Sequence, residues 1–419
     1  MKGVSLFHVG AIAIVGLVSA GPVGAQDTRA EIESEARSEK AQSSSSAAAP
    51  ERGFFEQAFT WATKKLDGSK DGFYPELGGL IPGSGWLGIG PGYRRHLFGD
   101  AALVEASAAI SSRRYSMMQS RIEWPKLASD HVSLGAQVRY QDFTEINYFG
   151  IGPHTSKADQ TDSRLQSLDI VGSATARSRD WFAVGARVGY MRSLNIEPGL
   201  SSIHPPTHER FDDTNAPGLT AHPRHEHADV FVEADLRDVP GYPTSGGIYR
   251  VGFAAFHDLD GSGYSFRRVE VDAAQYVPLF HKNWVVALRG RMALSQTASG
   301  QQVPFYQMPT LGGENSLRAY GDYRFRDRNV ALVGAEYRWP VLRMIDGALF
   351  ADAGTVGPTA GELWHARPNV DFGFGLRLHS TTRSIARLDV AKGHEGMRVV
   401  ASLRAPLRGS SRSVAPYVP

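Results

Sequence analysis

From Gly72 to Ala405, the main pattern along the chain is alternation of apolar residues with polar or small ones. The clearest example is the segment 330–339, where one side of the alternation is formed by Ala331, Val333, Ala335, Tyr337 and Trp339. A repeat of two residues is the side-chain period of a β-strand, so the pattern predicts an all-β fold whose strands have one apolar face. A soluble sandwich and a lipocalin-like barrel share this alternation, which therefore does not separate them from a membrane barrel.

The alternation divides the chain into sixteen strands, an even number, as bacterial membrane barrels have. We expect the strands at residues 74–81, 84–96, 101–112, 113–124, 131–142, 163–176, 180–193, 226–236, 245–258, 264–279, 283–297, 327–340, 345–354, 369–379, 384–392 and 397–405.

The lengths of the connections favour the membrane barrel. Long connections at 143–162, 194–225, 298–326 and 355–368 alternate with short ones. Short periplasmic turns opposite long outer loops are typical of outer-membrane barrels, and a sandwich does not sort its loops in this way. The sequence therefore predicts a 16-stranded antiparallel transmembrane β-barrel in the bacterial outer membrane, with outer-membrane lipids around it.

The two ends of the chain differ from the barrel segment, residues 72–405. Residues 1–25 have the charged start, short apolar run and small-residue cleavage site of a signal peptide. Residues 26–71 are predicted to be a polar linker with a short amphipathic helix, which packs on the barrel rim or lies at the membrane interface or in the lumen. Residues 406–419 form a polar tail.

Composition removes several classes of function. The chain has no cysteine, so its stability must come from packing or a closed hydrogen-bond network. Its net charge of +2 gives no general attraction to nucleic acid. No stretch reaches the roughly 18 apolar residues of a membrane helix.

The connection 298–326, the sixth outer loop in this count, is much longer than a hairpin turn of about two to five residues. It carries Arg318 after the glycine pair Gly312-Gly313. Glu336 and Asp352, on the next two strands, have the parity of inward-facing residues. An arginine on a loop folded into the lumen could pair with such carboxylates. The alternative from spacing alone is that Arg318 is a solvated loop cation.

Three segments in this order resemble a known family: LGGENSLRAYGDYRFRDRN (311–329), GAEYRWPV (334–341) and LFADAGTV (349–356). They are similar to the C-terminal barrel of the BamA/TamA superfamily, the bacterial surface antigen family of outer-membrane assembly and translocation proteins. The segment LRDVPGYPTSGGIYRVGF (236–253) resembles the family's middle periplasmic turn.

The resemblance implies an inward-folded sixth loop whose motif arginine meets two acidic wall residues. The positions that match this structural lock are Arg318, Glu336 and Asp352. The neighbouring motif positions are Gly312, Gly313, Leu317, Ala319, Tyr320, Phe350 and Gly354.

The resemblance also implies a function without catalysis, namely assembly or translocation of a narrow polypeptide client that a separate periplasmic partner protein could deliver. The first and last strands would form a weak seam, and the lock would brace the wall opposite it. A passive pore or a structural surface-antigen barrel is the alternative. A barrel hydrolase is a third possibility, because its serine and histidine could lie far apart in the sequence.

The chain departs from the family pattern in three places. Little room remains before the first strand for the family's periplasmic POTRA domains. Ala319 occupies the position of the motif glycine, and alanine disfavours positive φ. The polar tail replaces the usual terminal aromatic residue.

No metal or cofactor site is predicted. The histidines in or beside the fourth outer loop, residues 194–225, have no fixed spacing, whereas a metal site needs three or four convergent ligands. These histidines are His204, His208, His222, His225 and His227. The glycines of GIGPGY (88–93) lie on a strand pattern with no helix after it, unlike a dinucleotide-binding loop.

Overall fold

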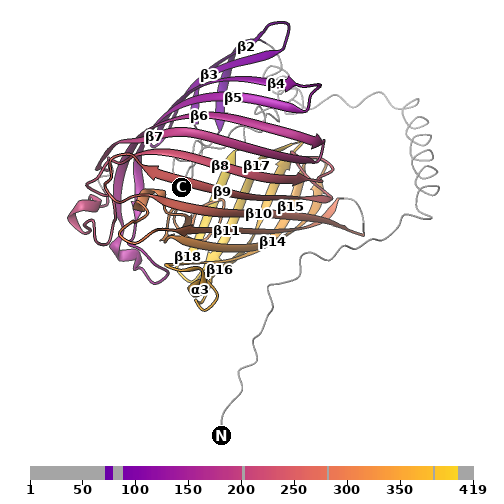
Figure 1. Ribbon diagram of the computed structural model, residues 1–419. Helices are drawn as coiled ribbons and strands as arrows, with labels where there is room; N and C mark the ends of the chain where they lie inside the picture. The colour runs from indigo at the N-terminus through magenta and orange to yellow at the C-terminus, as the bar shows by residue number, and fades with distance from the viewer. Residues whose placement is uncertain (1–70, 79–87, 201–202, 281–282, 381–382, 404–419) are drawn as a thin grey trace, which may run out of the picture. The chain divides into compact units, whose positions relative to one another are not determined.

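The computed structural model describes residues 71–78, 88–200, 203–280, 283–380 and 383–403 (Figure 1). The predicted signal peptide, the polar linker with its helix up to residue 70, and the polar tail lie outside these described residues.

Sixteen strands form one antiparallel sheet whose order follows the order of these strands along the chain. They are β1 (Gly72–Gly78), β2 (Gly88–Leu97), β3 (Ala102–Ser111), β4 (Ser116–Leu127), β5 (Val132–Tyr148), β6 (Thr161–Arg179), β7 (Phe182–Pro198), β8 (Arg224–Asp235), β9 (Gly246–Asp258), β10 (Phe266–Leu279), β11 (Trp284–Gln296), β14 (Asn329–Leu342), β15 (Ile345–Gly357), β16 (Asn369–His379), β17 (Ser384–Gly393) and β18 (Gly396–Leu403). The predicted strand number and antiparallel order are confirmed, with ends displaced by up to six residues.

β11 pairs directly with β14, because the two strands between them in sequence form a separate small sheet. These are β12 (Thr310–Leu311) and β13 (Phe325–Arg326), which pair with each other. They lie within the connection 297–328, so this long segment has its own hairpin.

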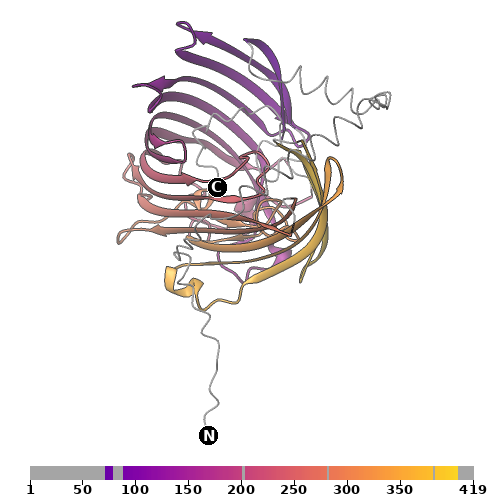
Figure 2. The same ribbon diagram turned by 90° about the vertical axis from the view of Figure 1, so that its right-hand side faces the viewer.

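The two faces of the sheet follow the alternation of the sequence. On β16, Phe372 and Phe374 are 57% and 59% exposed, whereas Asp371 before them and Arg377 after them, which have the opposite parity, are buried. The sheet is curled, so that one face turns inward (Figure 2). An exposed apolar face of this extent suits lipid, and a polar inner face suits the lumen of an outer-membrane barrel.

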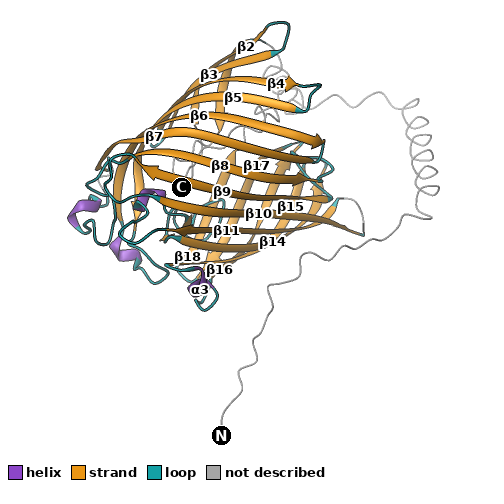
Figure 3. Ribbon diagram, viewed as in Figure 1, coloured by secondary structure: helices purple, strands orange, loops and turns teal. Residues whose placement is uncertain are grey.

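The longest connections lie at one end of the sheet. At the opposite end, β6 and β7 are joined through residues 180–181, and β14 and β15 through residues 343–344. The long connections are 149–160, 199–223, 297–328 and 358–368, and they contain the short helices η1 (Lys157–Asp159), η2 (Thr207–Glu209), η3 (Phe305–Gln307) and α3 (Ala360–Leu363) (Figure 3). No helix in the described segments is long and apolar enough to cross a membrane.

β1 and β18 are the two ends of the strand order, and no ladder joins them among the described residues. Closure of the sheet into a barrel therefore stays a prediction. β1 and β18 have 7 and 8 residues, whereas β6 has 19.

The apolar core lies where the long connections pack on the inner face. One cluster joins Tyr148 of β5 with Phe305 and Tyr323 of the connection 297–328. A second joins Leu317 and Tyr320 of this connection with strand residues that include Phe350. The connection is thus packed against the sheet, which places its tip beside the polar inner wall.

Candidate functional site: the sixth-loop cluster

The connection 297–328 is the sixth at the long-connection end, and we call it the sixth loop. The β12–β13 ladder closes its neck through the pairs Thr310↔Arg326 and Leu311↔Phe325. Gly312 has a φ of +109°, and a Cβ there would lie 2.1 Å from the carbonyl oxygen of Gly321. Glycine is therefore required at this position, because any side chain would collide with the returning strand.

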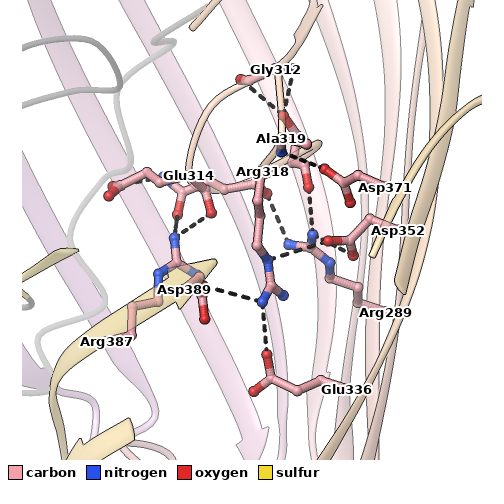
Figure 4. A network of polar contacts seen from close by, with 12 residues as sticks. Arg289, Gly312, Glu314, Arg318, Ala319, Glu336, Asp352, Asp371, Arg387 and Asp389 are labelled. Atoms are coloured by element: carbon pink, nitrogen blue, oxygen red, sulfur yellow. Dashed lines mark hydrogen bonds and ion pairs between the residues drawn. The ribbon is translucent and has the colours of Figure 1, made fainter. Parts of the chain in front are cut away.

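Arg318 lies near the tip of the loop and is only 4% exposed. Its Nη1 is 3.1 Å from Glu336 Oε2 and 3.3 Å from Asp389 Oδ2, and its Nε is 3.2 Å from Asp352 Oδ2 (Figure 4). The contact with Asp352 is an ion pair without hydrogen-bond geometry. Its guanidinium carbon is 3.9 Å from the centroid of the Phe350 ring, a cation–π distance. Three residues singled out in the sequence thus lie together, with Asp389 as an additional partner.

Each carboxylate also contacts a second arginine. Arg377 donates to Oε1 and Oε2 of Glu336 at 3.1 and 2.6 Å and to Oδ1 of Asp389 at 2.5 Å. Arg289 donates to Asp352 Oδ1 at 2.8 Å. We call Arg289, Arg318, Glu336, Asp352, Arg377 and Asp389 the sixth-loop cluster. Its three cations balance its three anions, which reduces the cost of removing these charges from water.

The backbone of the tip is also bound by strand side chains. The N–H of Ala319 donates to Asp371 Oδ2 at 2.7 Å. Arg289 donates to the carbonyl oxygens of residues 315 and 316 at 2.9 and 2.8 Å, and Arg387 donates to that of residue 314. Charge-assisted bonds of this kind hold the loop conformation as well as its position.

Further contacts reach the last strand of the sheet. Tyr320 Oη lies 2.8 Å from His394 Nδ1 in the β17–β18 turn, and Arg398 of β18 donates to the Tyr320 carbonyl at 2.6 Å. Arg324 Nε donates to Glu395 at 2.8 Å. The loop tip therefore contacts strands that adjoin the β18 edge. The expectation that it braces the wall opposite the seam is wrong, because Glu336 and Asp352 lie on β14 and β15, close to that edge.

The other motif positions are buried around the tip. Leu317, Ala319 and Tyr320 belong to the second apolar cluster together with Phe350, and a Cβ at Gly354 would lie 2.8 Å from a methyl carbon of Leu311. Ala319 is not among the described residues with positive φ. Alanine therefore replaces the motif glycine without backbone strain.

Sequence reasoning did not find Arg289, Arg377 or Asp389 as members of the site. All three have inward parity, but so do many other charged residues. Which of these charged side chains meet depends on the register of the strands and on the space that neighbouring residues leave. Gly334, for example, leaves room for the Arg289–Asp352 pair, because a Cβ there would lie 2.2 Å from Asp352 Oδ1.

The histidines of β8 lie elsewhere and have ordinary partners. His225 Nε2 is 3.0 Å from the carbonyl oxygen of Tyr264, and His227 Nε2 is 3.0 Å from Asp169 Oδ1. Among the described residues, no group of three or more His, Asp or Glu side chains is arranged to hold a metal ion.

Comparison with known proteins identifies the family. The model of the Omp85 superfamily domain matches residues 96–394. The chain belongs to the Omp85 superfamily. Omp85 barrels are transport and assembly proteins of the bacterial outer membrane rather than enzymes, and this chain is an outer-membrane protein of that superfamily.

Two solved structures resemble the fold. One is BamA from Haemophilus ducreyi lacking POTRA domains 1–3, with a TM-score of 0.59 and 18% identity over 80% of this chain and 70% of that one. The other is CdiB from Escherichia coli, with a TM-score of 0.51 and 11% identity over 83% of this chain and 70% of that one. At these identities the likeness concerns the fold.

Arg318→Ala should destabilise this Omp85 protein by about 3 kcal/mol, because it leaves buried carboxylates with one cation fewer. Urea unfolding, followed by the heat-modifiable gel mobility of the folded protein, measures this loss. Arg224→Gln is a suitable control, since Arg224 pairs with Asp260 at an exposed site, and it should leave the midpoint unchanged. Equal midpoints for Arg318→Ala and the unmodified protein would remove the structural role of the cluster.

Ala319→Gly, which restores the family's usual residue, should lower stability by about 0.4–1 kcal/mol. The reason is that Ala319 needs no positive φ here, so glycine only adds conformational entropy to the unfolded chain. The same urea titration is the measurement. A gain in stability would show that the tip prefers a conformation that alanine disfavours.

Asp327, at the base of the sixth loop, should make the protein more stable as the pH falls from 7 to 5. Burial, supported by the nearby charge of Glu362, raises its pKa to about 6, whereas an unfolded aspartate titrates near 3.9. The folded state thus binds more protons between these values, and its stability decreases as the pH rises through 6. Asp327→Asn should remove this pH dependence, a change on the order of 1–2 kcal/mol in the free energy of unfolding between pH 5 and 7.

The control for this pH series is Asp130→Asn, at an exposed turn, which should keep the slope of the unmodified protein. Identical slopes for Asp327→Asn and the unmodified protein between pH 5 and 7 would contradict the assignment.

Proposed function

We propose that this Omp85 protein assembles or translocates a narrow polypeptide client at the outer membrane, and that the client engages the β1 and β18 edges. The observation that carries the proposal is that no ladder joins these two strands among the described residues. The free N–H and C=O groups of an edge strand can pair with an incoming extended chain.

The hydrogen-bond ladder next to the β1 edge is interrupted, whereas the ladder next to the β18 edge is continuous. This difference supports a seam that opens from the β1 side. Pro75 lies in β1, and the β2–β3 ladder is interrupted at Gly90 and Pro91, between the pairs Ile89↔Ile110 and Gly92↔Ser107. Proline has no N–H to donate to a ladder. The β17–β18 ladder, in contrast, runs without interruption from Ala386↔Leu403 to Gly393↔Gly396.

The sixth-loop cluster fits this mechanism as a brace for the stronger edge. It ties the loop tip to β14–β17, and Arg398 extends the same contacts to β18. At the other edge, Tyr74 of β1 donates to Glu105 at 2.5 Å, and Glu105 also pairs with Arg94 and Arg121. In this mechanism, β18 holds its position while β1 and β2 move.

A passive pore, or a structural barrel in which the sixth loop is a plug, is the second candidate. It is favoured by the charged inner wall away from the loop, which includes the Arg187–Asp229 pair at 2.8 Å and the Arg250–Glu233 pair at 3.3 Å. A wall of this kind suits a water-filled lumen.

Photo-crosslinking in the native cell separates the two candidates. A photoreactive residue at Phe73 of β1 or Val399 of β18, which are 85% and 66% exposed, should capture polypeptide clients. The matched control is Val230 of β8, which is also outward-facing and 54% exposed but lies in the middle of the sheet, and it should capture none.

Equal capture at all three positions, or no capture at either edge, would contradict the proposal. If neither edge captures a client, steady channels in planar bilayers that persist in Arg318→Ala would support the passive barrel.

A further inference from the structure

A cavity of about 180 Å³ lies on the inner wall next to the sixth-loop cluster. It has room for roughly six water molecules at about 30 Å³ each. The charged residues that line it are Arg289, Arg318, Glu336, Arg338, Asp352, Arg377 and Arg387. Five arginines and two carboxylates line the cavity directly, and Asp389 and Asp346 contact the lining residues Arg377 and Tyr242.

The β8–β9 turn, residues 236–245, forms another side of the cavity through Gly241, Tyr242 and Pro243. Gly241 forms a parallel bridge with Arg383 and accepts a hydrogen bond from the Ser384 N–H at 3.0 Å. Tyr242 stacks on His379 with ring centroids 4.2 Å apart. The turn is therefore fixed against β16 and β17, and the cavity has a defined boundary on this side.

Arg338 differs from Arg289, Arg318 and Arg377, each of which forms an ion pair with a carboxylate. It is 5% exposed, and its Nη2 donates to the Pro243 carbonyl at 2.5 Å. Its guanidinium carbon is 4.6 and 5.6 Å from the ring centroids of Tyr242 and Tyr276. Its Nε has no hydrogen-bond partner. Within the described residues, Arg338 forms no ion pair with a carboxylate.

Asp346 and Glu336 both interact electrostatically with Arg338, but among the described residues neither carboxylate forms an ion pair with it. The oxygens of Asp346 contact Tyr242 Oη at 2.6 Å and His379 Nε2 at 3.3 Å. Burying a guanidinium that forms no ion pair with a carboxylate lowers the stability of the folded protein. An anion from solution, entering the adjacent cavity, would restore part of that stability.

We propose that this cavity binds a small oxyanion of the phosphate class, with Arg338 as its principal ligand. Guanidinium groups match the oxygens of phosphate in geometry and charge. Arginines of β11, β14, β16 and β17 and of the sixth loop surround the cavity, so that several oxygens of a tetrahedral anion have donors nearby. The site is separate from the β1 and β18 edges and does not depend on the polypeptide function.

Thermal unfolding of the folded full-length protein, titrated with inorganic phosphate at constant pH and ionic strength, tests the proposal. Phosphate should raise the Tm in a saturable manner, because it binds only the folded state. Arg338→Gln should weaken the apparent affinity by about tenfold or more. Arg250→Gln is the matched control, since Arg250 also lies over an aromatic ring of the inner wall but has Glu233 as its partner, and it should bind phosphate normally.

The proposal is overturned if phosphate produces no saturable stabilisation of the unmodified protein, or if Arg338→Gln binds it equally well. Arg338→Lys covers the case in which Arg338→Gln does not fold, because it keeps the charge and removes only the guanidinium; it should bind several-fold more weakly. Glycerophosphoethanolamine, titrated in parallel, distinguishes the two sources of the anion. Tighter binding of inorganic phosphate assigns the site to a free anion, and tighter binding of the phosphodiester assigns it to a lipid headgroup.

Discussion

The contact of one buried guanidinium with three carboxylates is the interaction on which the inner half of this protein depends. Arg318 comes from a loop, whereas Glu336, Asp352 and Asp389 come from three different strands. Removing four charges from water is unfavourable unless each finds a partner. Arg289 and Arg377 complete that pairing. The loop position and the registers of β14 to β17 are therefore coupled, because a one-residue slip would turn these side chains to the lipid face.

This coupling makes the sheet asymmetric. The strands near β18 are joined to one another by their ladders and again by the sixth loop, which crosses their inner faces. The strands near β1 are joined by their ladders and by side-chain pairs such as Arg94–Glu105 and Arg121–Glu105, and those ladders are poorer in hydrogen bonds near Pro75 and Pro91. A single fold thus combines a stiff side and a compliant side, and both the transport proposal and the passive-barrel alternative must account for that difference.

Much of the fold could be predicted from the sequence, because lipid on one side and water on the other impose a period of two on every strand. The same parity identified Glu336 and Asp352 as inward-facing. Parity does not determine which inward charges meet, since that depends on strand register and on the space left by residues such as Gly334. The strand order itself places Glu336 and Asp352 on the twelfth and thirteenth of the sixteen strands, nearer to the β18 edge than to the wall opposite the seam. Ala319 was treated as a departure, but its backbone conformation requires no glycine.

The gap in the β2–β3 ladder has a consequence for the order in which the sheet forms. Strands β5, β6 and β7 have ladders of 15 and 16 residue pairs. All pairings in the large sheet except β11–β14 join strands that follow each other directly in the sequence, which favours rapid zipping from the middle. Among the described residues β1 forms a ladder with β2 alone, and Pro75 donates no N–H to it, so this strand is stabilised only once β2 is in place. We therefore infer that β1 is added last, and that the nascent protein spends its final folding step with that edge still exposed to its surroundings.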